Sequence, residues 1–145
     1  RGEVVGINTA LVQGAQNIGF AIPINKAKKD IQDVKTRGKI VTPFLGVRHV
    51  LLTKDIQQRN NLSVDYGALI VRGPEGEPAI QPGSPAEKSG LKEGDIILEL
   101  NGTRIDADHS LGSLIANRQV GEEVTLKVRR DDETLTIKAR LEERR

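Results

Sequence analysis

The sequence predicts a mixed, mainly β fold. Short stretches with strand-like patterns, such as Asp95–Leu100 and Glu123–Arg129, are separated by Gly, Pro, Asn or Asp residues. Helical spacing of apolar residues occurs only in short stretches between these runs. At 145 residues, with 37% hydrophobic and 29% charged residues, the chain is expected to be ordered and to bury a real core.

The first residues, 1–24, predict a β-hairpin. Two runs, Glu3–Val12 and Asn17–Ile24, are joined by QGAQ, a Gly-containing connection of the kind that links hairpin strands. Both runs are apolar at nearly every residue, which is typical of strands covered on both faces. Because an isolated two-stranded hairpin is marginal in water, we expect these strands to have lost their partners.

An amphipathic helix is predicted at Lys26–Thr36. Apolar residues, among them Ile31 and Val34, recur there at helical spacing. Asn25 can cap the first turn, and Gly38 fits the position just past a helix end.

From residue 42 onward the pattern predicts a compact domain of short strands and helices. In chain order we expect a strand at Leu45–Val50, a helix at Lys54–Asn60 capped by Thr53, a strand at Ala68–Arg72, a surface loop at Gly73–Pro82, a helix at Ala86–Ser89, a strand at Asp95–Leu100 with its turn at Asn101-Gly102, a helix at His109–Arg118, and strands at Glu123–Arg129 and Thr134–Leu141 joined through Asp131-Asp132.

The stretch GSPAEKSGLKEGDIILELNG, residues 83–102, is the most specific signal in the chain. Ser84 is a helix-entry residue, and Pro85 opens a one-turn helix at the position where proline is tolerated. Gly90 ends this helix, Leu91 enters the core, and Gly94-Asp95 turns into a buried strand.

This stretch resembles the PDZ domain, whose Ser-Pro-Ala, Gly-Leu, Gly-Asp-x-Ile and Asn-Gly motifs it matches in order. PFLGV, residues 43–47, then falls where that family keeps its carboxylate-binding loop. The resemblance implies a PDZ-like, partly open β-barrel or sandwich with two or three helices.

The front of the chain is similar to the last strands of the trypsin-like barrel in HtrA (Deg) serine proteases, through RGEVVGINTA and NIGFAIPIN. We therefore expect terminal protease strands at 1–24, a linker helix at 25–41 and a PDZ domain at 42–145. The family's Gly-Asn-Ser-Gly-Gly-Pro nucleophile motif and its catalytic His and Asp do not occur in the sequence. No residue here is expected to be catalytic, whereas the parent protein would be a homo-oligomeric serine endopeptidase of the periplasm or cell envelope.

The resemblance assigns carboxylate binding to the amides of Leu45, Gly46 and Val47, with Phe44 as a wall. Consecutive backbone N–H groups in a turn bind an anion without a positive side chain. Gly46 is expected to let the guest backbone approach closely. The rest of the guest would add as a strand along Val47–Val50, which includes Arg48 and His49.

The second wall is expected to be the helix HSLGSLIANR, residues 109–118. On a helical wheel Leu111 and Ile115 share one face, which we assign to the core. Ser110, Leu114 and Asn117 share the neighbouring face, which we assign to the groove, with Leu114 as the floor of the pocket. The alternative is that Leu114 belongs to the core and Leu111 takes its place.

Other polar residues favour structural roles. His49 and His109 lack metal-ligand spacing, so no metal is expected, and no cofactor is implied. The serines lie outside any Gly-x-Ser-x-Gly setting, which argues against a nucleophile. Asp131 and Asp132 are read as a turn rather than as an acid–base pair.

Thr9, Ala10, Leu11 and Ile18 are expected to be remnants of the protease's substrate pocket. In the whole protease, the resemblance implies, Thr9–Leu11 would pair with the substrate backbone. Leu11 and Ile18 would help to line an aliphatic specificity pocket. A strand pair that fills a barrel core explains the same residues equally well.

Three classes of function are considered, and the missing catalytic triad argues against one of them, an enzyme that retains hydrolytic activity. The leading hypothesis is a binding module that captures polypeptide C-termini or unfolded segments for the parent protease, in protein quality control. The alternative is an interaction or oligomerisation segment in which the groove or the front strands bind neighbouring subunits. Neither nucleic acid nor a membrane span is expected.

Overall fold

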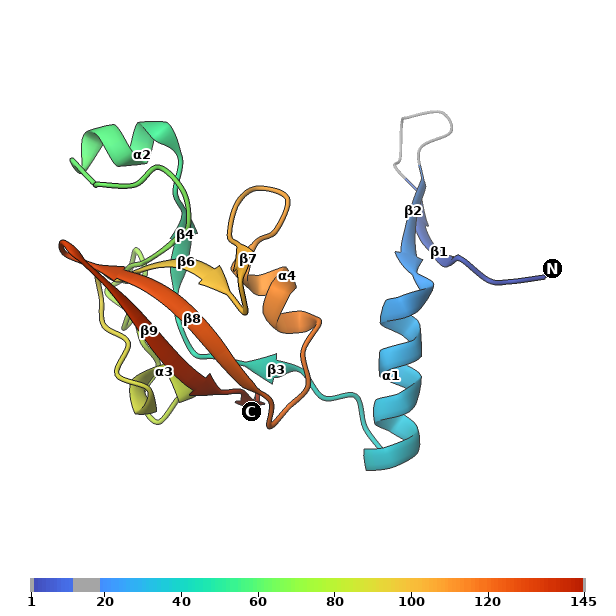
Figure 1. Ribbon diagram of the computed structural model, residues 1–145. Coiled ribbons are helices and arrows are strands. Elements are labelled where there is room, and N and C mark those ends of the chain that lie inside the picture. The colour runs from blue at the N-terminus through green and yellow to red at the C-terminus, as the bar shows by residue number, and fades with distance from the viewer. Residues whose placement is uncertain (1, 12–18, 145) are drawn as a thin grey trace. The chain divides into compact units, whose positions relative to one another are not determined.

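The computed structural model describes residues 2–11 and 19–144, and these residues divide into two compact units between Val41 and Thr42 (Figure 1). Among the described helices none is long and apolar enough to cross a bilayer.

The first unit is a hairpin followed directly by a helix. Strands β1 (Gly6–Leu11) and β2 (Gly19–Pro23) pair antiparallel, and α1 (Ile24–Arg37) begins where β2 ends. The helix has no side-chain cap at its start, so the expected capping by Asn25 is wrong; Pro23 occupies that position. Gly38 ends the helix in the left-handed conformation, as its sequence position predicts.

Several large apolar side chains of this unit are exposed. Val5 is 84% exposed, Phe20 60% and Ile31 52%, although strands and helices normally bury such residues. The hairpin and helix therefore leave an apolar surface uncovered.

The second unit is built on an open antiparallel sheet. Its strands follow the order β4-β5-β6-β8-β9, β7 pairs with β6, and the path does not close into a barrel. The strands are β4 (His49–Leu51), β5 (Ala68–Ile70), β6 (Ile96–Leu100), β7 (Thr103–Arg104), β8 (Glu123–Arg130) and β9 (Glu133–Arg140). A separate ladder joins β3 (Pro43–Phe44) to β10 (Glu142–Glu143). The mixed, mainly β prediction is confirmed.

Three short helices complete this unit: α2 (Lys54–Arg59), α3 (Pro85–Lys88) and α4 (Leu111–Ala116). Each begins at a hydroxyl residue whose side chain accepts a hydrogen bond from the amide three residues on: Thr53, Ser84 and Ser110. The predicted cap at Thr53 and the helix entry at Ser84 are thus confirmed.

Helix α4 starts two residues later than the sequence predicts. The Oδ1 atom of Asp106 accepts hydrogen bonds from the amides of Asp108 (3.1 Å) and His109 (2.8 Å). This side-chain turn holds the chain out of the helical conformation until Ser110 caps the first turn.

Strand β6 separates two apolar clusters. Ile97 and Leu100 belong to the main core, together with Leu45, Leu111 and Leu126. Ile96 and Leu98 point to the other face, where Leu52 and side chains on and near α2 cover them. The sequence prediction of a buried strand at this position is confirmed, because both of its faces are covered.

The strand predicted at Leu45–Val50 is interrupted. β3 ends at Phe44, Val47 forms only an isolated bridge with Ile80, and β4 starts at His49. Gly46 has φ +91°, a left-handed conformation that breaks an extended path. The interruption creates the loop on which the site is built.

Candidate functional site

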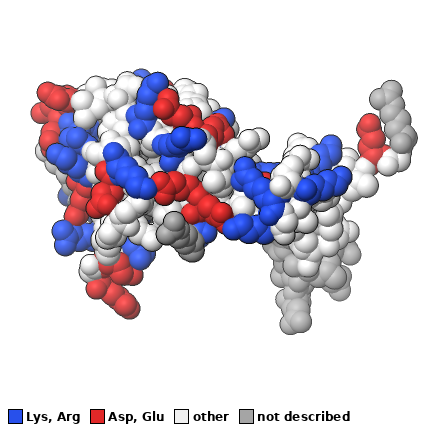
Figure 2. All heavy atoms as spheres, turned by 90° about the horizontal axis from the view of Figure 1, so that it is seen from below, with Lys and Arg blue, Asp and Glu red and all other residues white. Residues whose placement is uncertain are grey.

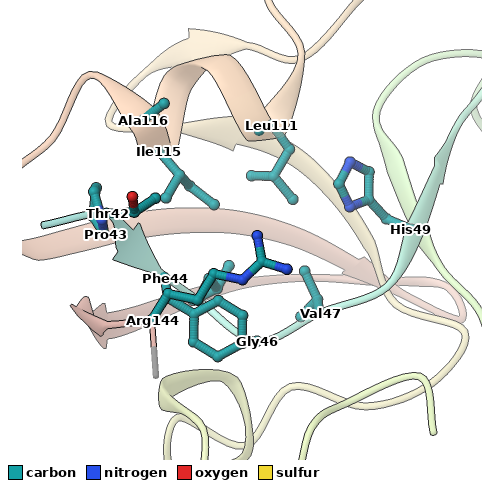
Figure 3. A pocket seen from close by; sticks show the side chains of 12 residues that line it. Thr42, Pro43, Phe44, Gly46, Val47, His49, Leu111, Ile115, Ala116 and Arg144 are labelled. Atoms are coloured by element: carbon teal, nitrogen blue, oxygen red, sulfur yellow. The ribbon is translucent and has the colours of Figure 1, made fainter. Parts of the chain in front are cut away.

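A cavity of about 210 Å³ lies between this loop and α4 (Figure 3). Its walls are mostly apolar, so it suits an apolar side chain. The residues that line it are Thr42, Pro43, Phe44, Leu45, Gly46, Val47, His49, Leu111, Gly112, Ile115, Ala116 and Arg144.

Two carbonyl contacts fix the orientation of the loop. The Leu45 carbonyl accepts a hydrogen bond from the Ala86 amide (2.8 Å), and the Gly46 carbonyl accepts one from the Gln81 amide (2.9 Å). In a trans peptide the N–H points opposite to the C=O. The amides of Gly46 and Val47 therefore point away from these contacts.

Three consecutive amides of the loop have no protein acceptor. Within residues 2–11 and 19–144, no hydrogen bond uses the amide of Leu45, Gly46 or Val47. These N–H groups are adjacent in sequence and lie at the edge of the cavity. Unpaired donors grouped in this way suit an anionic acceptor.

Gly46 is required by packing inside the domain. A Cβ atom there would overlap the Ser84 Cβ atom and lie 2.5 Å from Ser84 Oγ. Ser84 is 3% exposed and caps α3. Ser84 thus occupies the space that a side chain at position 46 would take, and the expected close approach of a guest to Gly46 stays a prediction.

The loop at Gly73–Pro82 supports the site and is more than a surface excursion. Ala79 is buried, and its carbonyl accepts a hydrogen bond from the Arg48 amide (2.8 Å). The Gln81 amide donates to the Gly46 carbonyl. The end of this segment is thus hydrogen-bonded both to the loop around Gly46 and to the residue that precedes β4.

Strand β4 presents an open edge beside the cavity. The Arg48 carbonyl accepts from the Val71 amide (3.1 Å), and the Leu52 amide donates to the Gly67 carbonyl (2.8 Å), so these residues bond inward. Since main-chain groups alternate along a strand, those of His49 and Leu51 face the other edge. No strand of the described residues pairs with β4 there.

The predicted residues of α4 lie partly at the cavity and partly outside it. Leu111 and Ile115 line the cavity and are also buried in the core. Leu114 packs against the core outside the lining, while Ser110 and Asn117 occupy the two cap positions of the helix. The cavity is an extension of the core, so the core-facing residues form its wall. Which of Leu111 and Leu114 contacts a guest stays a prediction, and the lining of the cavity favours the alternative with Leu111.

The other predicted residues are placed as follows. Phe44, Val47 and His49 line the cavity, whereas Arg48 lies outside the lining and pairs with Glu77 at 3.6 Å. Sequence reasoning missed Arg144, which reaches the cavity because β10 pairs with β3. No periodicity reveals such a long-range pairing.

Burial lowers the pKa of His49 below its ordinary value of 6.5, and a hydrogen bond with the Val47 backbone acts in the opposite direction. His49 is therefore neutral at neutral pH. His109 is exposed, and its amide, bonded to Asp106, is the main cause that lowers the pKa of that carboxyl group.

The predicted protease remnants belong to the first unit. Thr9 Oγ1 donates a hydrogen bond to the Phe20 carbonyl (3.3 Å), and Ala10 and Leu11 lie in β1. Ile18 lies outside the described residues. The described part of the chain contains no group of acidic, His or Cys residues that could hold a metal ion.

Comparison with known proteins shows which family the chain is similar to. The sequence pattern of the PDZ domain matches residues 43–141. Periplasmic pH-dependent serine endoprotease DegQ of Escherichia coli is 35% identical over 97% of this chain and 30% of its own length. Serine protease Do-like HtrB of Bacillus subtilis is 32% identical over 97% of this chain and 31% of its own length. The chain thus spans about a third of the length of these curated relatives.

Solved structures show the same likeness. The HtrA-type protease AlgW with a decapeptide superposes with a TM-score of 0.77 at 26% identity, over 99% of this chain and 43% of that one. AlgW with a tripeptide gives a TM-score of 0.73 at 25% identity, over 99% of this chain and 46% of that one.

Proposed function

The chain belongs to the PDZ domain family, in the form found in HtrA-type serine proteases, and on this premise we propose that its cavity binds the C-terminal end of another polypeptide. The guest's terminal carboxylate accepts hydrogen bonds from the amides of Leu45, Gly46 and Val47. Its last side chain enters the cavity against Leu111 and Ile115.

The observation that carries this proposal is the group of unpaired amides at the cavity edge. A hydrogen bond to a charged group contributes about 1.5–3 kcal/mol. A micromolar complex needs about 8 kcal/mol in total, so a few such bonds and one filled apolar pocket are sufficient. An acceptor of this kind is present at the end of every unmodified polypeptide.

The open edge of β4 supports an extended guest. His49 and Leu51 can exchange main-chain hydrogen bonds with a strand laid beside them, which is β-augmentation. The solved relatives are described with a decapeptide or a tripeptide, which is the same class of guest. Contact with both the amides and the strand edge gives affinity, and the cavity gives selectivity for an aliphatic last residue.

The parent protein is proposed to be a serine endopeptidase of the periplasm or cell envelope, since the Escherichia coli relative is named a periplasmic serine endoprotease. In it, the PDZ domain would deliver C-terminal or unfolded segments to the protease domain for protein quality control. The chain itself is expected to leave unfolded casein uncleaved.

The guest's own chemistry offers the cleanest test. We would measure fluorescence anisotropy of a labelled decapeptide that ends in valine, with its terminus either free or amidated. We expect the amidated peptide to bind at least about tenfold more weakly, because it loses the charge on the acceptor. Equal affinities would overturn the carboxylate assignment, and they would do so without any change to the protein.

The exposed apolar residues of the first unit favour a second role in oligomerisation. Val5, Phe20 and Ile31 are the kind of surface that recruits another chain. Sedimentation over a range of concentrations tests this role, since a monomer at every concentration contradicts it.

A further inference from the structure

Arg144 reaches into the mouth of the cavity. Its amide donates a hydrogen bond to the Thr42 carbonyl (3.0 Å), which fixes its backbone beside β3. Its side chain is part of the cavity lining. In Figure 3 the guanidinium group extends from Arg144 across the Phe44 ring, toward the space between Leu111 and Val47.

The guanidinium group has no acidic partner within the described residues. The neighbouring carboxylate of Glu142 pairs with Lys88. None of the residues that line the cavity is Asp or Glu. The exposed guanidinium group of Arg144 therefore lies over apolar walls, and no described residue supplies a counter-ion.

Acidic and basic side chains elsewhere are interleaved. Figure 2 shows them mixed over one face of the second unit, and ion pairs such as Arg72–Glu93 and Lys127–Glu99 neutralise many of them locally. Arg144 departs from this pattern at the position where a guest would end.

We propose that Arg144 is a guest-binding residue that pairs with the terminal carboxylate from the side opposite the amides of Leu45–Val47. The inference rests on the proposed function and adds a charged partner to it. A guanidinium group binds a carboxylate through directed hydrogen bonds that are stronger than neutral ones.

The fold couples the two sets of donors. Phe44, which precedes the three amides, pairs with Glu142 in the β3–β10 ladder, and Arg144 follows that ladder directly. A change in the position of β3 therefore moves the amides and the guanidinium group together. The ladder acts as a common base for the recognition of one carboxylate.

A double comparison tests this proposal. The same decapeptide, with a free or an amidated terminus, is titrated into the wild-type chain and into Arg144→Gln. We expect the substitution to weaken binding of the free peptide about tenfold and binding of the amidated peptide less than about twofold, because only the free peptide carries the paired charge. Increasing salt should lower the affinity for the free peptide less in the variant than in the wild type.

Arg59→Gln is the matched control. Arg59 is exposed on α2, outside the cavity lining, and its replacement removes the same charge. Affinity should remain within about twofold of the wild type. Thermal unfolding of both variants checks that the fold is intact.

The outcomes separate the two proposals. If amidation weakens wild-type binding but Arg144→Gln weakens both peptides equally, or neither, the role of Arg144 is overturned and the amide site stands. If amidation has no effect on the wild type, the proposed function itself fails. If the loss of affinity caused by Arg144→Gln depends on an acidic side chain within the peptide and not on its terminal carboxylate, the role assigned to Arg144 is also contradicted.

Discussion

Asp95 and Arg130 form a bidentate ion pair in which the carboxylate is almost fully buried. Asp95 is 1% exposed, and its oxygens accept from Arg130 Nε and Nη2, each at 2.7 Å. The Lys92 amide donates to the same carboxylate (2.8 Å), and Arg130 also donates to the Gly90 carbonyl (2.8 Å). The hydrogen bond with Asp95 raises the pKa of Arg130 above its ordinary value. The pair thus fastens the turn that follows α3 to the end of β8.

Removal of Arg130 should destabilise the domain. Arg130→Gln leaves the Asp95 carboxylate buried without its counter-ion, and we expect a loss of about 3 kcal/mol in the free energy of unfolding. Arg72→Gln is the control, because Arg72 bonds Glu93 at 2.8 Å while both side chains are about half exposed or more. It should lose less than about 1 kcal/mol. Urea unfolding measures both values, and equal losses would contradict the role of burial.

Gly46→Ala should weaken the fold as well as binding. The residue would be held at φ +91°, and its new Cβ would overlap Ser84. We expect a loss of at least about 2 kcal/mol, from the left-handed backbone and the steric overlap together. Gly90→Ala, at φ +79° with no atom within 4 Å of the new Cβ, should lose only about 1 kcal/mol.

A double variant isolates the overlap. Ser84→Gly removes the side chain that the new Cβ atom at position 46 would meet, so Gly46→Ala should be less destabilising in that background by about 1 kcal/mol or more. Ser84→Gly alone should lower the free energy of unfolding by only about 0.3 kcal/mol, because glycine is a tolerated N-cap residue. If the effects of the two substitutions on the free energy of unfolding are strictly additive, Ser84 does not determine the need for glycine at position 46.

Local chemistry explains how much of the fold the sequence predicts. Thr53 and Ser84 cap helices that begin where expected, and Asn101-Gly102 forms the turn between β6 and β7, with φ +49° and +78°. These features depend on residues that are only a few positions apart in the sequence. Strand β6 was also predictable, because its short apolar run lies between the turn residues Gly94-Asp95 and Asn101-Gly102.

The rest depends on contacts that are distant in sequence. The need for glycine at position 46 follows from packing against Ser84, and the presence of Arg144 in the cavity follows from the β3–β10 ladder. The helical wheel of α4 gave the correct core residues, Leu111 and Ile115, but not their second role as cavity wall. A wheel describes directions around one helix, and it carries no information on where the core opens.

Ala116→Leu should narrow the cavity. Ala116 lines it from the last turn of α4, and three added carbon atoms would occupy the space proposed for the guest's last side chain. We expect peptides ending in leucine to bind about tenfold more weakly, and peptides ending in alanine to change less than about threefold. Ser113→Leu makes an exposed leucine outside the lining of the cavity and should leave both affinities unchanged. Similar effects of the two substitutions would contradict the position of the pocket.

Stability should depend on pH through His49. Burial lowers the pKa of this residue in the folded chain, whereas the unfolded chain keeps the ordinary value of 6.5. As the pH falls below that value, the unfolded state binds the proton first, so the contribution of neutral His49 is fully present above pH 6.5 and is lost as the pH falls through the folded pKa. Urea unfolding at about pH 7.5 and about pH 5 should therefore show a smaller decrease in the free energy of unfolding for His49→Gln than for the wild type.

His109→Gln is the control, because it removes one histidine as well, but an exposed one. If the His49 variant loses as much stability on acidification as the wild type, burial of this imidazole does not govern the pH dependence.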